Sequence, residues 1–203
     1  MTLGMAIIAI LTVRLAAPIE STDIWWHMAF GRLILDSGSL IVDHSIFSWT
    51  PAISDFIYNS WLSQITLYLI DEHTGIAGLI TLRYLVFFGI LLLAWRFAVK
   101  HDITNNPLTW LIVLVSLTFA WPKFTVKPEL FSLGLMTLTV WLFYRIRCIG
   151  DAAWRQAYLF PLILIAWINI HGAFFLASLF IASVIIGELL NIKFSPSQAM
   201  SSK

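Results

Sequence analysis

Asp23 and His27 are the first residues in the chain whose types and spacing suit proton-transfer chemistry. They fall in a stretch, residues 23 to 35, whose pattern predicts a helix. Four residues apart, the carboxyl and imidazole groups share one helix face, where Asp23 could act as a general base and His27 could orient it. Asp23 could instead cap the helix, and His27 could simply face lipid headgroups. An apolar stripe on another face consists of Trp26, Phe30 and Leu33.

Charged residues that could help handle a phosphate occur further along the chain. Lys123 and Lys127 flank a short turn, and an ammonium group near a low-dielectric boundary attracts phosphate strongly. Both lysines could equally bind anionic lipid or extend toward the interface. Glu129 is expected to support the site, to pair with Lys127 or to cap the next helix. Glu20 is a possible helper of the base or a solvated end residue.

Asn169 and His171 interrupt an apolar run just before Gly172. Polar groups inside such a run are costly unless they have partners. The pattern therefore predicts a broken helix beside a cavity, or side chains that satisfy the backbone at a kink. Arg83 lies inside another apolar run and needs a partner, a path to the interface, or an anion.

The composition is that of an integral membrane protein. Of 203 residues, 60% are hydrophobic and only 11% are charged, against about a quarter charged in soluble domains. The net charge of +1 argues against a nucleic-acid partner. Cys148 is the single cysteine, which excludes an internal disulfide and a multi-thiolate metal site. The sequence allows a divalent metal as cofactor but does not imply one.

The hydropathy pattern predicts an all-α, polytopic transmembrane helix bundle of about six spans. We expect residues 1 to 190 to form one transmembrane domain, followed by a polar tail over 191 to 203. The loop over residues 20 to 75 is acidic and is expected to carry two interfacial amphipathic helices, at 23 to 37 and 61 to 70. The predicted spans are 2 to 19, 76 to 98, 107 to 121, 130 to 146, 157 to 170 and 173 to 190.

Basic residues predict the orientation of these spans. The densest Lys/Arg clusters lie at 96 to 101 and 145 to 155, which places both turns in the cytoplasm by the positive-inside rule. Alternation then puts the acidic first loop outside. Lys123 and Lys127 become basic residues on the external side, an exception that fits anion binding. The residues expected to meet at this external edge are Asp23, His27, Lys123, Lys127, Glu129, Asn169 and His171.

Five short motifs resemble a set of bacterial polytopic membrane proteins related to the GT-C glycosyltransferases. They are DIWWH at 23 to 27, FSWT at 47 to 50, WLSQ at 61 to 64, KPELFS at 127 to 132 and WINIHG at 167 to 172. Their order and spacing match over about residues 5 to 190. The resemblance implies a bacterial inner-membrane protein with a catalytic acid soon after its first span. It also implies a sugar donor carried on polyprenyl phosphate and transfer on the external face.

The chain departs from the related sequences in two respects. Ser21 and Ser60 stand where those sequences often have acids, and the related chains are much longer. The leading expectation is an inverting glycosyltransferase with Asp23 as base, Lys123 and Lys127 at the donor phosphate, and lipid and lipid-linked sugar as its ligands. The alternative is a non-catalytic membrane subunit that keeps the scaffold and packs against other subunits.

Overall fold

The computed structural model describes residues 2 to 19, 21 to 41, 57 to 149 and 154 to 194, and these are almost entirely helical. Short 3-10 turns join several of the helices. The elements are α1 (Thr2–Leu15), α2 (Asp23–Ser37), α3 (Trp61–Lys100), α4 (Pro107–Ala120), η2 (Trp121–Lys123), α5 (Pro128–Ile149), η4 (Trp154–Tyr158), α6 (Leu159–Ile170), η5 (Gly172–Phe174) and α7 (Phe175–Phe194).

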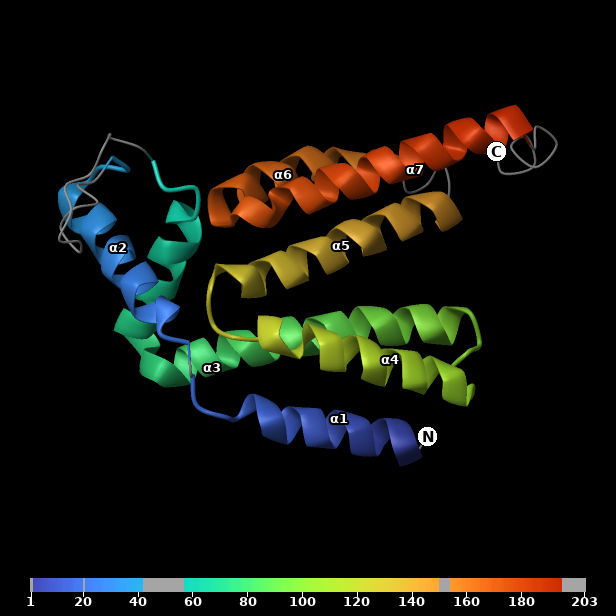
Figure 1. Ribbon diagram of the computed structural model, residues 1–203, viewed down its shortest axis with the longest axis horizontal. Coiled ribbons are helices and arrows are strands. Elements are labelled where there is room, and N and C mark those ends of the chain that lie inside the picture. The colour runs from blue at the N-terminus through green and yellow to red at the C-terminus, as the bar shows by residue number, and fades with distance from the viewer. Residues whose placement is uncertain (1, 20, 42–56, 150–153, 195–203) are drawn as a thin grey trace.

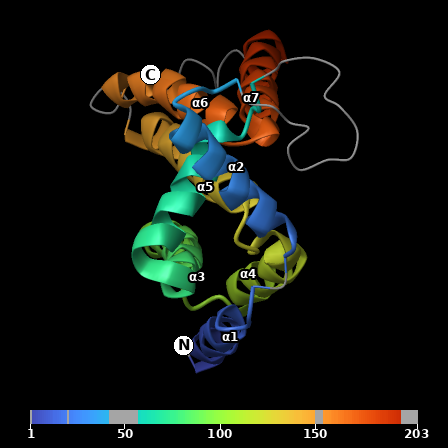
Figure 2. The ribbon, with the colours of Figure 1, turned by 90° about the vertical axis from the view of Figure 1, so that its left-hand side faces the viewer.

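The long helices run lengthwise beside one another and alternate in direction (Figure 1). This alternation brings α2, the start of α3, the start of α5 and the α6–α7 junction to one end of the bundle. We call it the α2 end. Seen from that end, α2 lies across the tips of the other helices (Figure 2). Both ends of the described chain point toward the opposite end of the bundle (Figure 1).

Among the residues that the structure describes, three helical segments are long and apolar enough to cross a membrane: α3, α5, and η5 together with α7. The all-helical class expected from the sequence is confirmed over the described residues, and these three apolar segments are candidate membrane spans. The apolar helices α4 and α6 are shorter. A count of six spans and an external first loop remain predictions.

The first helix is shorter than predicted. It ends at Leu15, not at Ile19, because Pro18 disfavours helical backbone at the residue before it. Two side chains from α3 hold this end of α1. The Arg83 guanidinium donates hydrogen bonds to the carbonyls of Leu15 and Ala17, and the Tyr84 hydroxyl donates to the Thr12 carbonyl at 3.0 Å. The predicted need of Arg83 for a partner is confirmed.

The second predicted surface helix and the span after it follow one another directly within α3. The break expected near residue 75 is confirmed, because Gly75 has φ 64° and ψ −164°. Only glycine adopts this backbone region readily, so the direction of α3 changes there. The first part of α3 packs against α2, and the second part joins the bundle (Figure 1).

The predicted apolar stripe of α2 is confirmed. Phe30 is buried with Ile34, and Trp26 and Leu33 pack against them together with Trp61 and Ile65 of α3. A second cluster, which the sequence did not indicate, joins Ile24 and Met28 to Leu67 and Leu79 of α3 and Val126 before α5. The imidazole of His27 is buried between these contacts. The predicted end of α2 is confirmed, since the residue after Ser37 is a glycine in the left-handed region with φ 64°.

Gly31 permits the close approach of α2 to α3, and this gives the first testable prediction. A Cβ atom on Gly31 would lie only 2.2 Å from the backbone oxygen of Gln64. We therefore expect Gly31→Ala to lower the free energy of unfolding by about 1 to 3 kcal/mol. Thermal unfolding of purified protein in detergent measures this.

The matched control is Gly89→Ala in α3, because a Cβ there meets no heavy atom within 4 Å. This change should be neutral or stabilising, by about 0.5 to 1 kcal/mol. Equal midpoints for Gly31→Ala and the wild type would contradict the described α2–α3 packing.

Candidate functional site

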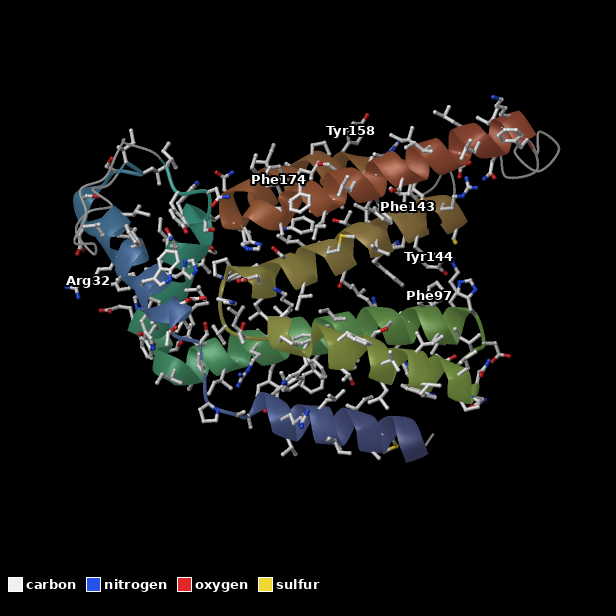
Figure 3. All side chains as sticks on the ribbon, viewed as in Figure 1. Arg32, Phe97, Phe143, Tyr144, Tyr158 and Phe174 are labelled. Carbon is white, nitrogen blue, oxygen red and sulfur yellow. The ribbon has the colours of Figure 1, made fainter. Side chains whose placement is uncertain are left out.

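A polar cavity of about 270 Å³ lies at the α2 end of the bundle. Figure 3 shows Arg32 on the outer face of α2, at the opposite end of the bundle from Phe97 and Tyr144. We call it the acidic cavity. It is lined by Asp23, Trp26, His27, Tyr58, Asn59, Ser60, Pro128, Glu129, His171 and Gly172.

Lys127 connects two of the carboxylates at this site. Its Nζ lies 3.5 Å from Oδ2 of Asp23 and 3.3 Å from Oε1 of Glu129. Burial lowers the pKa of Lys127, but the two carboxylates outweigh burial and raise it. The ammonium group therefore stays charged and is already paired with two carboxylates, so a donor phosphate would have to compete with them.

Asp23 is available for chemistry at the rim of the cavity. It is the first residue of α2, and Thr22 holds the capping position, so the alternative that Asp23 caps the helix is wrong. A carboxylate in the first helical turn is still favourably placed near the positive end of the helix dipole. Its side chain is 51% exposed, which leaves room for a substrate hydroxyl.

His27 does not face lipid headgroups. It is 7% exposed, and its Nδ1 lies 3.4 Å from Nε2 of Gln64 in α3. Burial lowers its pKa to about 4, although nearby Asp23 and Glu129 act in the opposite direction. The imidazole is therefore neutral at pH 7.

His171 is held in one tautomer by its neighbours. The indole Nε1 of Trp167 donates to Oγ of Ser132 at 2.8 Å, and that hydroxyl lies 2.9 Å from Nδ1 of His171. The backbone N–H of Ala173 also donates to Nδ1 at 3.4 Å. Because an amide N–H can only donate, Nδ1 is the acceptor and the neutral ring carries its proton on Nε2. Burial lowers the pKa of His171.

Two predicted site residues, Asn169 and Lys123, lie elsewhere. Asn169 is absent from the cavity lining, because its Oδ1 accepts from Nε1 of Trp61 at 2.8 Å and its amide donates to the Ile165 carbonyl. The hydrogen bond between Asn169 and Trp61 joins α6 to α3. Lys123 lies exposed in η2 and makes no ion pair with any residue that the structure describes. Glu20 and the FSWT motif at 47 to 50 lie outside the described residues.

The prediction from sequence missed the tripeptide before Trp61. Tyr58, Asn59 and Ser60 all line the acidic cavity. Burial and the charge of Asp23 raise the pKa of Tyr58, which therefore stays protonated at neutral pH. Three successive hydrogen-bonding side chains immediately before a helix start are a signal that could have indicated this contribution.

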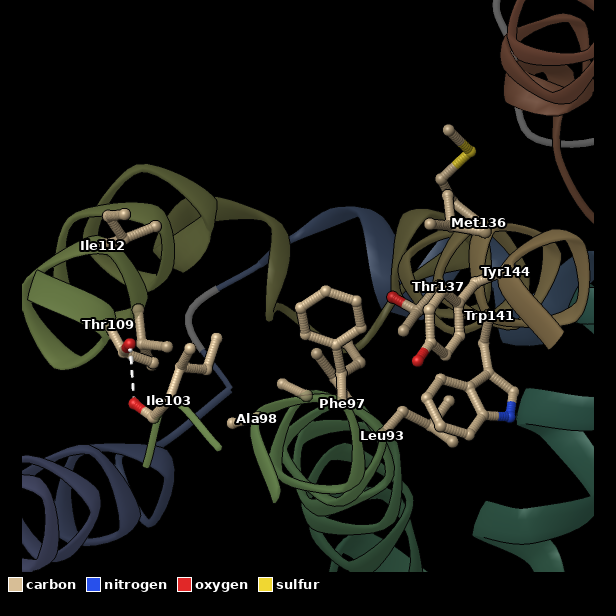
Figure 4. Close-up of a pocket in the computed structure, with 14 residues that line it drawn as sticks. Leu93, Phe97, Ala98, Ile103, Thr109, Ile112, Met136, Thr137, Trp141 and Tyr144 are labelled. Atoms are coloured by element: carbon tan, nitrogen blue, oxygen red, sulfur yellow. Dashed lines mark hydrogen bonds between the residues drawn. The ribbon is translucent and has the colours of Figure 1, made fainter. Parts of the chain in front are cut away.

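A metal centre is not evident in the described ranges, where no three His, Cys, Asp or Glu side chains gather with metal-binding geometry. A larger cavity of about 530 Å³ lies between α3, α4 and α5 toward the opposite end (Figure 4). Its lining is apolar apart from a few residues such as Thr109 and Tyr144, so it offers no carboxylate or imidazole for acid–base chemistry.

Comparisons of the chain with protein-family models, with curated proteins and with solved structures found no match. The resemblance to proteins related to GT-C glycosyltransferases therefore stays a prediction.

The lowered pKa of His27 predicts a pH-dependent stability. The folded protein binds fewer protons at His27 than the unfolded chain does, since the pKa falls from 6.5 to about 4 on folding. The stabilisation is complete above pH 6.5 and is lost as the pH falls toward 4, by about 2 to 3 kcal/mol. Thermal unfolding in detergent between pH 7 and 4.5 measures this loss.

His27→Gln should remove that part of the pH dependence. His73→Gln is the control, because His73 is exposed on α3 and should leave the slope as in the wild type. The same slope in all three proteins would show that His27 does not titrate with a lowered pKa.

Proposed function

We propose that this protein is a GT-C-like glycosyltransferase of the bacterial inner membrane, which transfers a sugar from polyprenyl phosphate to an acceptor on the external face. The observation that carries the proposal is the half-exposed carboxylate of Asp23 at the rim of the acidic cavity, 3.5 Å from the ammonium group of Lys127. A base and a cation side by side are what transfer from a phosphate leaving group needs.

The proposed reaction is a single displacement. An acceptor hydroxyl gives its proton to the Asp23 carboxylate while its oxygen forms a bond to the anomeric carbon of the sugar. The bond between that carbon and the phosphate oxygen breaks, and the polyprenyl phosphate leaves with the electron pair. Attack from the face opposite the leaving group inverts the anomeric configuration.

Lys127 has a second role in this proposal. While no donor is bound, its ammonium group lies 3.5 Å from the Asp23 carboxylate. An incoming phosphate competes for this ammonium group and leaves the Asp23 carboxylate free to accept the proton of the acceptor hydroxyl. Glu129 keeps Lys127 in place at 3.3 Å.

The histidines supply neutral groups around the reacting atoms. His171 has its proton on Nε2 and lines the acidic cavity, so it can donate a hydrogen bond to a sugar hydroxyl without adding charge. His27 lines the same cavity and is held in position by its contact with Gln64. Burial lowers the pKa of both histidines, so both imidazoles are neutral at pH 7.

The test is the replacement of Asp23 in the full chain, purified in detergent. Asp23→Asn keeps the size of the side chain and removes the base. We expect it to reduce sugar transfer by about 10²- to 10⁴-fold. A panel of polyprenyl-phosphate hexoses and pentoses serves as donors, and release of polyprenyl phosphate is the readout.

Asp36→Asn is the matched control, since Asp36 is an exposed acid on the same helix and pairs with Arg32 at 3.4 Å. It should release polyprenyl phosphate at the wild-type rate. Equal rates for Asp23→Asn and the wild type would overturn the enzymatic proposal and favour the non-catalytic membrane subunit.

A further inference from the structure

A second polar cavity lies beside the first and contains two arginines. Its volume is about 110 Å³, and it is enclosed by the end of α1, by α3 and by the segment from η2 to α5. We call it the arginine cavity. Its polar lining comes from Arg14, Arg83 and Thr125.

One hydrogen-bond donor of the Arg83 side chain has no partner in this cavity. The side chain is 6% exposed and its Nη2 donates to the carbonyls of Leu15 and Ala17. Its Nε is buried and has no partner, and the same is true of the hydroxyl oxygen of Thr125. Buried polar atoms are almost always satisfied, so two orphaned atoms at one cavity indicate a missing group.

The positive charge of the two arginines indicates that the missing group is an anion. The Arg14 guanidinium lies 5.8 Å from the centre of the Trp121 ring. Arg83 lies within the apolar part of α3, eight residues or about 12 Å beyond the break at Gly75. Neither arginine forms an ion pair with any acid in the described part of the chain. A buried, uncompensated guanidinium within a membrane span is costly, and an anion is the partner that would compensate it.

Phosphate is the anion that suits these groups best, because guanidinium groups match its geometry with paired hydrogen bonds. We propose that the arginine cavity binds the phosphate group of a membrane lipid. Resting on the proposed function, that lipid is the polyprenyl-phosphate donor. Arg83 and Thr125 would satisfy their free polar atoms on the phosphate oxygens, and Arg14 would close the cavity from the side of α1.

The position of the cavity fits the acidic site beside it. Val126 lines the arginine cavity, and the next residue is Lys127, which contacts Asp23. A phosphate held by Arg83 would therefore present its attached sugar toward the carboxylate of Asp23.

The experiment measures binding of polyprenyl monophosphate to the full chain in detergent by tryptophan fluorescence. Unphosphorylated polyprenol, inorganic phosphate and phosphatidylglycerol are the comparison probes. We expect Arg83→Gln to weaken binding of polyprenyl monophosphate at least tenfold. Arg14→Gln and Thr125→Val should weaken it threefold or more.

Arg14→Gln and Thr125→Val keep the test valid if Arg83→Gln fails to fold, since neither side chain holds the end of α1. Arg32→Gln is the control, because that arginine lies on the exposed face of α2 and pairs with Asp36. It should bind polyprenyl monophosphate as the wild type does. Polyprenol should bind weakly and equally to every variant.

The outcomes separate this inference from the proposed function. Equal binding of polyprenyl monophosphate to the wild type, Arg14→Gln and Thr125→Val would mean that ordered water alone fills the cavity, and would overturn the inference. Equally tight, arginine-dependent binding of phosphatidylglycerol would support a lipid-phosphate site but overturn its assignment to the donor. Arginine-dependent binding together with undiminished transfer by Asp23→Asn would keep the phosphate site and remove the glycosyltransferase.

Discussion

The contact of Lys127 with Asp23 and Glu129 is the interaction on which the acidic cavity depends. It joins residues 104 positions apart and ties the start of α2 to the start of α5. Its energy is modest, because partly exposed ion pairs contribute about 0.2 to 1 kcal/mol. The contact therefore matters for position more than for stability. The buried packing of α2 on α3 involves Ile24, Met28 and Gly31. This packing keeps α2 rigid and holds Asp23 within reach of Lys127.

Two neighbouring cavities with opposite charge follow from this arrangement. The acidic cavity is lined by carboxylates and neutral imidazoles, and suits hydroxyl groups of a sugar or acceptor. The Lys127 ammonium group pairs with both of its carboxylates. The arginine cavity has guanidinium groups that pair with no acid in the described part of the chain, and it suits a phosphate. Val126 and Lys127 follow one another along the segment between them. On the proposed function, this separation keeps the leaving group and the base apart while the sugar spans the distance.

The sequence predicted much of the fold, since apolar runs and glycines specify it locally. The helix from Asp23 to Ser37 and the break at Gly75 come from patterns within a few residues of each other. The predicted end of α1 was wrong. The prediction followed the length of the apolar run, whereas the helix ends earlier because of the local effect of Pro18. The gathering of Asp23, Lys127 and His171 was expected from alternation of helices. The ion pair itself, and the entry of Tyr58 to Ser60 into the cavity, depend on tertiary packing that no local pattern encodes.

Membrane sidedness is the most direct test of the central claim that the α2 end forms one external, water-facing site. Single cysteines at Asn59 and Lys123, both exposed, are placed in a Cys148→Ser background and compared with the exposed native Cys148. A membrane-impermeant maleimide is added to intact bacterial cells. The account predicts labelling at positions 59 and 123 in intact cells, and at Cys148 only after permeabilisation. Labelling of positions 59 and 123 from opposite sides, or of either from the side of Cys148, would contradict it.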